Sequence, residues 1–244
     1  MTDKGYRSRG FETAKFDHLR DDYRKGLEEI KALDYSPEDY MHFFPAFAGE
    51  MTLLKYLSIY ELYKQTLDVA GHIAELGMYK GAASLLFAKL TKIYEPYACT
   101  LVHGFDWFRG GGNLSAREME VVSDGVYQES EERVRALIEA QRLSNIVKVH
   151  NLDLSSDDID AFLDENPHLY FKLVLVDAGI ESVLKKSIPA FWERMTVGGI
   201  MIFDHYSFET APSEAGLINT LLPGVPVKAI RPGWMPVAYV TKGT

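Results

Sequence analysis

The chain has 244 residues, of which 47% are hydrophobic and 25% are charged, a balance typical of a globular protein with a substantial core. This length fits one large α/β domain, or a domain with a modest cap, and it excludes a small disulfide scaffold or a fibre. With 35 acidic against 26 basic residues, the formal net charge is −9, which disfavours nucleic acid as a partner because such a surface repels phosphates.

The sequence shows none of the signals that direct a chain to a membrane or to secretion. Residues 1–22 lack the apolar run of a signal peptide, and no apolar stretch reaches the roughly 18 residues that span a bilayer. The single cysteine, Cys99, rules out an intramolecular disulfide and a multi-cysteine metal site. We therefore expect a cytoplasmic protein without a membrane partner.

Two parts are expected along the chain: an N-terminal arm or lid in residues 1–50 and the main domain in residues 51–244. The first 40 residues are polar and charged, and they read either as this arm or as a partly ordered tail. Weak helical periodicity involves four of their apolar residues: Tyr23, Leu27, Ile30 and Leu33. Three aromatic residues just beyond are either core or part of the lid: Phe43, Phe44 and Phe47.

Residues 51–67 are predicted to form an amphipathic helix. Six residues recur in it at helical spacing: Leu53, Leu54, Leu57, Tyr60, Glu61 and Lys64. Such a helix has two possible partners, a second copy of the chain or the chain's own sheet. The first of these predicts a homo-oligomer.

From residue 70 onward, segments typical of strands alternate with segments typical of helices. The expected strands are residues 71–77, 99–106, 145–153, 170–179 and 196–206. The expected helices are residues 81–94, 129–143, 157–166 and 182–195. Residues 225–243 read as two strands joined by a Pro/Gly loop, which predicts an antiparallel hairpin. The alternation predicts an α/β fold with a mostly parallel sheet and helices on both faces.

In sheets of this kind, ligands bind beyond the carboxyl ends of the strands. The segment from Glu75 to Gly81 joins the first strand to a helix. Gly77 lets the backbone turn, and Gly81 lets the helix begin near the sheet, where its N-terminus can hold an anion. The dinucleotide fingerprint requires glycine at the position of Tyr79, so nicotinamide and flavin cofactors are disfavoured.

Acidic residues close the next two strands. Asp106 can accept hydrogen bonds from both hydroxyls of a ribose, or it can serve as a helix cap. Asp153 can accept from an adenine amine, or it can cap the following helix, a role for which Ser155 and Ser156 compete.

Asp177 ends a buried strand, and Asp204 and His205 end another. Side chains at neighbouring strand ends can bind one divalent cation, and carboxylate oxygens favour Mg²⁺, Ca²⁺ or Mn²⁺. In the alternative interpretation, both aspartates cap helices and His205 is a satisfied polar residue.

The combination of YELYK at 60–64, the ELG turn at 75–77 and GFDWF at 104–108 resembles the class I S-adenosylmethionine-dependent methyltransferases. More narrowly, it resembles the macrocin O-methyltransferase-like sugar O-methyltransferases. The segments LVLVDAG and GGIMIFDHY match as well, and the resemblance runs from about residue 45 to the C-terminus. It implies a Rossmann-like fold, with a mostly parallel seven-stranded sheet, a C-terminal antiparallel hairpin and an N-terminal helical lid.

The resemblance also implies an activity and a set of site residues. The activity is S-adenosylmethionine-dependent methylation of a sugar hydroxyl, on a nucleotide-linked deoxysugar or a natural product, in antibiotic or saccharide biosynthesis. The residues implied to bind the cofactor are Glu75, Gly77, Met78, Tyr79, Gly81, Phe105, Asp106, Trp107, Asp153 and Asp177. Those implied to bind a divalent cation, Mg²⁺ or Ca²⁺, are Asp177, Asp204 and His205.

The catalytic residues are expected to be Asp177 and His205. A cation at Asp177 and Asp204 would lower the pKa of the acceptor hydroxyl, and His205, with an ordinary pKa of about 6.5, suits a general base. One nitrogen of His205 cannot serve both as ligand and as base. The chain departs from its relatives at Gly179 and His205, where they commonly carry acids, so the sequence leaves the base and the metal requirement open.

Three other functions stay open on the sequence alone. One is methylation of a catechol-like hydroxyl or an amine. Another is an NAD-dependent oxidoreductase, which Tyr79 and the terminal hairpin disfavour. The third is a non-catalytic binding protein, which Gly179 and His205 favour.

Overall fold

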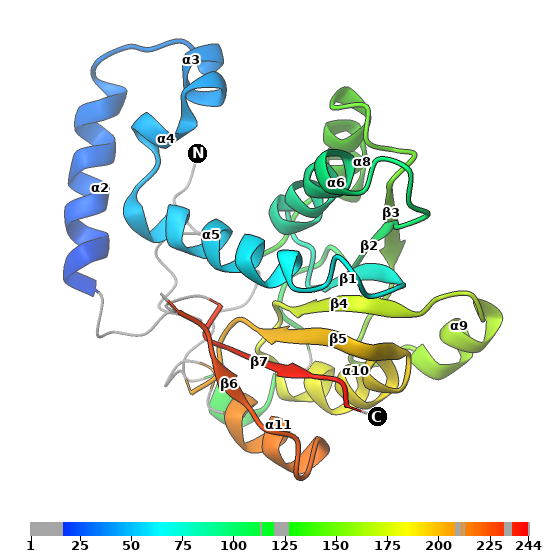
Figure 1. Ribbon diagram of the computed structural model, residues 1–244. Coiled ribbons are helices and arrows are strands. Elements are labelled where there is room, and N and C mark those ends of the chain that lie inside the picture. Colours follow the sequence, from blue (N-terminus) through cyan, green and yellow to red (C-terminus); the bar gives the residue numbers. More distant parts are fainter. Residues whose placement is uncertain are drawn as a thin grey trace.

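The computed structural model describes residues 17–112, 114–119, 127–207, 211, 213–231 and 236–243. These residues form a seven-stranded sheet of order β3-β2-β1-β4-β5-β7-β6 (Figure 1). The strands are β1 (His72–Leu76), β2 (Val102–Asp106), β3 (Val147–Asn151), β4 (Phe171–Val176), β5 (Met195–Phe203), β6 (Lys228–Ala229) and β7 (Ala238–Thr241). Strands β1 to β5 are parallel, whereas β7 runs antiparallel to β5 and to β6. The predicted sheet and its terminal hairpin are confirmed; residues 232–235 of the hairpin loop lie outside the described residues.

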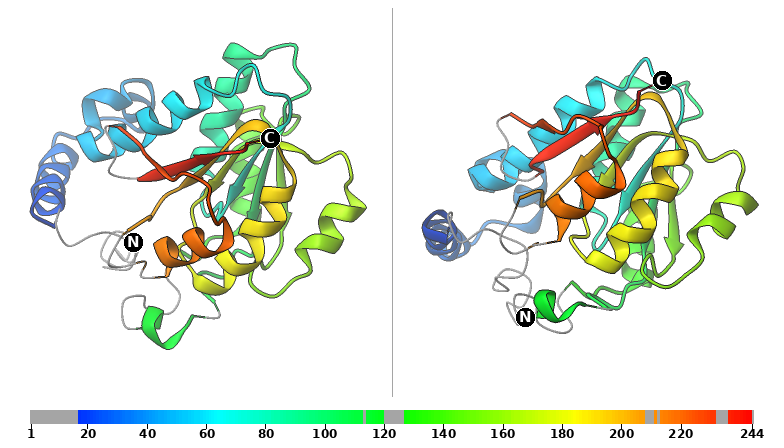
Figure 2. Two further views of the ribbon diagram at one scale, coloured as in Figure 1. Left: turned by 60° about the horizontal axis from the view of Figure 1, so that its bottom comes forward. Right: turned by 90° about the horizontal axis from the view of Figure 1, so that it is seen from below.

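Helices cover both faces of this sheet (Figures 1 and 2). One face packs against α5 (Glu50–Lys64), α6 (Ala82–Tyr94) and α8 (Glu131–Ala140), and the other against α9 (Ile159–Glu165), α10 (Glu181–Glu193) and α11 (Glu214–Leu221). The remaining helices are α2 (Asp17–Lys31), α3 (Pro37–His42), α4 (Phe44–Phe47) and α7 (Ala116–Met119). No helix among the described residues has the length and apolar character to cross a membrane.

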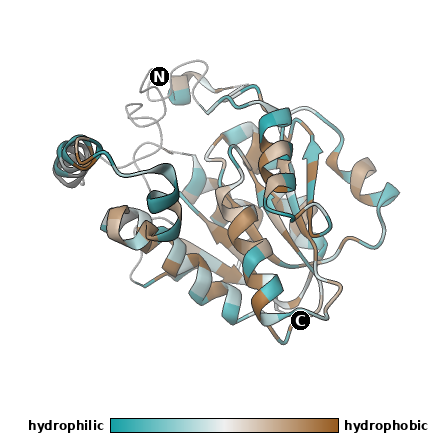
Figure 3. Ribbon diagram, turned by 90° about the horizontal axis from the view of Figure 1, so that it is seen from above, coloured by the Kyte–Doolittle hydropathy of each residue, from teal (hydrophilic) through white to brown (hydrophobic). Residues whose placement is uncertain are grey.

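The core is built by side chains that alternate between the two faces of the buried strands. All six residues of β4 are buried. Leu173 and Leu175 belong to the hydrophobic cluster on the α5–α6 face, whereas Val174 and Val176 belong to the cluster on the α10 face. The central strands are accordingly mostly hydrophobic (Figure 3), with His72 and Glu75 in β1 and Lys172 in β4 as exceptions.

The N-terminal helices lie to one side of the sheet. Helix α2 confirms the helical periodicity predicted around Leu27 and Ile30, and it stands apart from the strands in Figures 1 and 2. Residues 1–16 of the expected arm lie outside the described residues. Helix α5 connects this part of the chain to the sheet, so its placement decides which N-terminal residues reach the strand ends.

A buried ion pair holds the C-terminal end of α5 against the sheet. Lys172 of β4, whose side chain is 1% exposed, binds the carboxylate of Glu95. The Tyr63 hydroxyl of α5 and the Thr100 hydroxyl also donate to Glu95. A buried pair of this kind fixes geometry more than it adds stability. Helix α5 is therefore tied to β4 near its end.

The buried face of α5 differs from the predicted one. The buried residues are Ser58, Ile59, Leu62 and Tyr63. Leu57, which the predicted stripe included, is 53% exposed. The helix itself is confirmed, but the stripe through Leu57 and Glu61 was wrong, because the sequence of this helix carries apolar and aromatic residues on more than one face.

Gly77, directly after β1, lies where no other residue fits. Its φ of +92° is in the left-handed region, and an added Cβ would stand 2.4 Å from the carbonyl oxygen of Asp177. The end of β1 therefore approaches the end of β4 at backbone contact.

Gly77→Ala is expected to lower the free energy of unfolding by about 2–5 kcal/mol, the sum of left-handed strain and overpacking. Thermal or urea unfolding measures this change. The matched control is Gly216→Ala in α11, where an added Cβ meets nothing within 4 Å; it should be neutral or stabilising by up to about 1 kcal/mol. Equal stability of the two variants would contradict this interpretation of Gly77.

Candidate active site

The sequence-predicted polar residues meet at the carboxyl edge of the sheet because the parallel strands end in register. Leu76 of β1 pairs with Phe105 of β2 and with Val176 of β4, and Val176 pairs with Phe203 of β5. The residues that follow these positions therefore form one row across four strands: Asp106, Gly77, Asp177 and Asp204. The four strand ends therefore lie side by side, as a site at this edge of the sheet requires.

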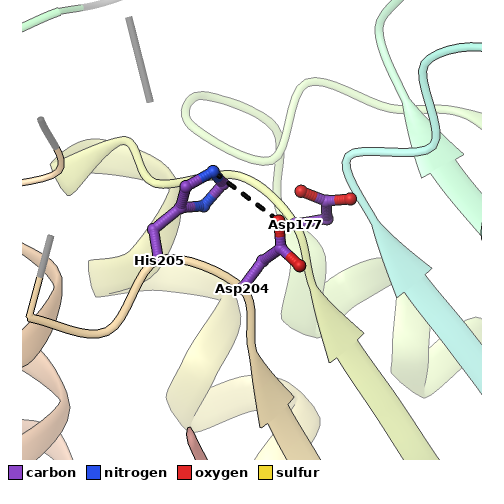
Figure 4. Close-up of side chains that lie close together, drawn as sticks. All are labelled: Asp177, Asp204 and His205. Carbon is purple, nitrogen blue, oxygen red and sulfur yellow. Dashed lines mark ion pairs between the residues drawn. The ribbon is translucent and has the colours of Figure 1, made fainter. Parts of the chain in front are cut away.

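Asp177, Asp204 and His205 come together at one end of this row. One ligand atom from each lies within 4.8 Å of the others. Figure 4 shows the three side chains close together at the ends of the strands. The Nε2 atom of His205 is 3.6 Å from Oδ2 of Asp204. The side chain of Asp177 is 21% exposed, whereas those of Asp204 and His205 are 0% and 7% exposed. Asp177 is therefore the member of the cluster most open to a ligand.

Lys55, which the sequence analysis did not single out, completes the cluster from α5. Its Nζ atom lies 2.9 Å from Oδ2 of Asp177 and 3.1 Å from Oδ2 of Asp204. One ammonium thus bridges two carboxylates that end neighbouring strands. Lys55 precedes Ile59 and Leu62 by four and seven positions, so the sequence places it on the same face of the helix, but only the structure shows that this face is buried.

The charges in this cluster shift one another's pKa values. Burial works against the charge of Lys55, but Asp177 and Asp204 outweigh it and raise the pKa of the ammonium. Burial also opposes ionisation of Asp177, yet Lys55 lowers the pKa of Asp177 below its ordinary value. Burial and the charge of Asp177 raise the pKa of Asp204. Burial lowers the pKa of His205 to about 4, so its ring is neutral at pH 7.

Glu214 is a further buried carboxyl beside this cluster. Its side chain comes from α11 and is fully buried, and burial together with the charge of Asp204 raises its pKa well above the ordinary value. Neither α11 nor a role for Glu214 is predicted from the sequence, because an isolated glutamate at the start of a short helix resembles an ordinary solvated one.

A divalent cation does not fit between these carboxylates while Lys55 holds its position. The ligand atoms of Asp177, Asp204 and His205 are close enough to one another for an ion. However, the same Oδ2 atoms already bind the ammonium. An ammonium and a divalent ion 4 Å apart would repel by on the order of 8 kcal/mol at an effective dielectric constant of 20. The predicted metal-binding role of the three residues stays a prediction.

The glycine loop from Gly77 to Gly81 occupies the other end of the row. Asp106 accepts a hydrogen bond from the Tyr79 backbone N–H (2.7 Å) and another from the Phe108 N–H (2.7 Å). Tyr79 itself has a left-handed backbone, with φ of +48°. Asp106 therefore shapes the loop and stands beside it, a placement that fits an adenosyl cofactor bound along the loop with its ribose at this carboxylate.

Glu75 lies beneath the loop as a cap of α6. Its carboxylate accepts hydrogen bonds from the Ser84 backbone N–H (2.8 Å) and from the Ser84 hydroxyl. The side chain is 2% exposed, and burial raises its pKa to about 8, against the opposing effect of Ser84. Glu75 thus stabilises the start of the helix behind the loop.

Two residues expected to contact the cofactor have side chains that are buried in the core. Phe105 is 0% exposed and stacks on His150 with ring centroids 4.6 Å apart. Met78 is 1% exposed and fills the space beside Gly104, where a Cβ would stand 2.3 Å from its sulfur. These two side chains are buried because the geometry of the strand and of the loop points each of them into the core between the sheet and its helices. Their backbone still forms part of the strand end and loop.

Trp107 and Asp153 are half-buried, and their side chains form hydrogen bonds with residues close to them in the chain. The Trp107 indole N–H donates to the Gly110 carbonyl, and the ring lies against Gly112. Asp153 accepts hydrogen bonds from the Ser155 N–H (2.9 Å) and the hydroxyls of Ser155 and Ser156, which outweigh burial and lower its pKa. Asp153 therefore organises the turn after β3. It is not the cap of the following helix, because Asp158 is the N-cap of α9 and accepts from the Ala161 N–H.

The raised pKa of Glu75 predicts a pH dependence of stability. Between its ordinary pKa of 4.5 and its folded value of about 8, the folded state holds a proton that the unfolded state releases. The stabilisation is complete below pH 4.5 and is lost as pH rises toward 8, with a slope of up to about 1.4 kcal/mol per pH unit. Glu75→Gln removes this contribution, so its unfolding free energy should fall less over that range.

Urea unfolding at several pH values measures the difference between Glu75→Gln and the unmodified protein. Glu193→Gln, at an exposed position on α10, is the control and should keep the full slope. Identical slopes for all three proteins would show that Glu75 is ionised in the folded state at neutral pH.

Comparison with known proteins agrees with this architecture. The family described as a methyltransferase domain matches residues 74–206. The chain is 24% identical to CalS11, a calicheamicin methyltransferase, over 93% of both chains, with a TM-score of 0.80. An apo structure of CalS11, described as a TDP-rhamnose 3′-O-methyltransferase of calicheamicin biosynthesis, is 25% identical over 93% of this chain and 95% of that one, with a TM-score of 0.74.

A more distant likeness concerns the fold alone. The O-methyltransferase NovP is 16% identical over 78% of this chain and 79% of its own, with a TM-score of 0.65. A search of curated protein sequences gives no match. The family match covers more than half of the chain and contains the strand ends from Glu75 to His205. The chain therefore belongs to the methyltransferase domain family and has the fold of the class I S-adenosylmethionine-dependent methyltransferases.

Proposed function

We propose that this methyltransferase acts on a sugar hydroxyl, on a deoxysugar that is linked to a nucleotide or carried by a natural product. The observation that supports this most is the strand-end row: the glycine loop and Asp106 at one end, and the cluster around Asp177 at the other. This arrangement sets a cofactor loop beside polar groups that can bind a hydroxyl. The TDP-rhamnose methyltransferase CalS11, which aligns along 93% of this chain, supports a sugar as the acceptor.

S-adenosylmethionine supplies an electrophilic methyl group on a sulfonium. We propose that Gly77, Tyr79 and Gly81 bind its methionine end with Glu75 beneath them, and that the Met78 backbone lines the same loop. Asp106 would hold the ribose hydroxyls, with Trp107 and Asp153 on the adenosine side. The support is geometric, because Asp106 already fixes the loop through Tyr79 at 2.7 Å.

Asp177 is proposed to hold the acceptor hydroxyl and to receive its proton. It is the most exposed carboxylate of the cluster, and it lies beside Gly77, at the junction of the loop and the cluster. Orienting the hydroxyl toward the methyl group supplies much of the rate acceleration in such a transfer. His205 is neutral and deeper, so its low basicity suits a supporting position better than direct proton removal.

Further parts of the proposal concern assembly and location. Exposed apolar side chains on the N-terminal helices, Met41 (73%), Phe43 (62%) and Phe44 (43%), support a homo-oligomer, because large apolar side chains grouped on a surface often mark an interface. Residues 1–50 are proposed to serve as the lid or arm in that assembly. A cytoplasmic location and the absence of a nucleic-acid partner are proposed from composition alone.

Asp177→Ala is expected to reduce methylation of a nucleotide-linked deoxysugar by about 10²–10⁴-fold, the contribution of a positioned proton acceptor. Binding of S-adenosylhomocysteine should survive. Turnover is followed by methyl transfer to a panel of nucleotide sugars, and binding is followed by calorimetry. Asp164→Ala, on an exposed residue of α9 that pairs with Arg194, is the control with unchanged turnover.

The outcomes separate the rival functions. Full activity of Asp177→Ala would remove the proposed role of this residue. Methylation of catechols or amines but of no sugar would overturn the acceptor class. Binding of NAD in place of S-adenosylhomocysteine would overturn the cofactor, and cofactor binding without any acceptor would indicate a non-catalytic binding protein.

A further inference from the structure

Lys55 takes the central position of the acidic cluster. Its ammonium contacts both Asp177 and Asp204 within 3.1 Å. These are the two carboxylates that a cation at this edge of the sheet would bind. The described chain thus supplies its own positive charge at the point where the sequence predicted a metal ion.

The position of Lys55 is built into the fold. One turn and two turns further along α5, Ile59 and Leu62 are buried against the sheet. The C-terminal end of the same helix is tied to β4 through Tyr63, Glu95 and Lys172. The Lys55 side chain is itself only 24% exposed. It is therefore held over the strand ends by the helix that carries it.

The charge balance of the cluster suits a monovalent cation. Asp177 and Asp204 carry at most two negative charges, and His205 adds none because an imidazole ring is either neutral or positively charged. With the ammonium in place, at most one negative charge of these two carboxylates remains to attract an ion. Divalent cations bind where several charged oxygens converge, so this cluster holds a divalent ion poorly as long as Lys55 stays.

We propose that Lys55 is the resident cation of this active site and that the protein needs no divalent metal ion for methyl transfer. The catalytic part of this inference rests on the proposed function. Lys55 binds Oδ2 of Asp177 and so fixes that carboxylate for the acceptor hydroxyl. It also sets a positive charge near the oxygen on which negative charge develops as the proton leaves.

In the step itself, the acceptor oxygen forms a bond to the methyl carbon while the carbon–sulfur bond breaks. The electron pair of that bond stays on sulfur, which leaves as the neutral thioether. The hydroxyl proton passes to Asp177 and from there to water. Lys55 keeps its protons throughout and acts by position and charge.

The first test is Mn²⁺ binding, measured by electron paramagnetic resonance on the full chain without acceptor. Lys55→Ala should bind Mn²⁺ at least about tenfold more tightly than the unmodified protein, because it frees both carboxylates from the ammonium. Adding Asp204→Asn to that variant should abolish the gained site. Lys64→Ala, a lysine of the same helix that pairs with exposed Glu61, is the matched control and should behave as the unmodified protein.

The second test is the metal dependence of turnover. The unmodified enzyme should keep its rate after treatment with EDTA. Lys55→Met, which keeps the length of the side chain without its charge, should lose about 10²-fold in kcat, with little change in affinity for S-adenosylhomocysteine. Added Mn²⁺ should restore part of the activity of Lys55→Ala, which a merely structural role of Lys55 would not produce.

Tight, stoichiometric Mn²⁺ binding by the unmodified protein, or loss of its turnover in EDTA, would overturn the inference. Because the Mn²⁺ measurement needs no acceptor, it tests whether Lys55 is the resident cation even if the protein methylates no sugar. Binding of S-adenosylhomocysteine shows that each variant is folded. A Lys55→Ala variant that is folded but gains no Mn²⁺ affinity would also contradict the inference that Lys55 is the resident cation.

Discussion

Two carboxylates that end neighbouring parallel strands lie too close together to remain charged without a cation between them. In this protein Asp177 and Asp204 form such a pair at the end of β4 and β5, and Asp204 is fully buried. The Lys55 ammonium bridges them at 2.9 and 3.1 Å. This contact joins α5 to the edge of the sheet and makes a residue from outside the matched family segment, 74–206, part of the site.

The rest of the site depends on how closely the strands approach at this edge. Gly77 allows the backbone of β1 to touch that of β4, and Asp106 fixes the loop that follows. The Lys172–Glu95 pair and Tyr63 hold α5 in its place above the same strands. Backbone geometry thus sets the loop that we propose for the cofactor beside the charged cluster that we propose for the acceptor hydroxyl.

The sheet could be predicted from the sequence because its strands are short buried runs that end in Asp106, Asp177 and Asp204, and parallel strands bring such ends together. The place of Lys55 in the site could not be predicted, because Lys55 contacts Asp177 across 122 positions of the chain and because the predicted apolar face of α5 was wrong. For Phe105 and Met78, the resemblance gave the position in the chain but not the direction of the side chain. Only the packing of the strands turns both into the core.

The most direct test of the resident cation is a crystal structure grown with S-adenosylhomocysteine and Mn²⁺, with diffraction recorded at the manganese absorption edge. We predict the Lys55 Nζ atom between Asp177 and Asp204, the adenosyl compound along the loop at Asp106, and no anomalous peak at the cluster. A manganese peak bound by Asp177 and Asp204, with Lys55 turned away, would contradict this account.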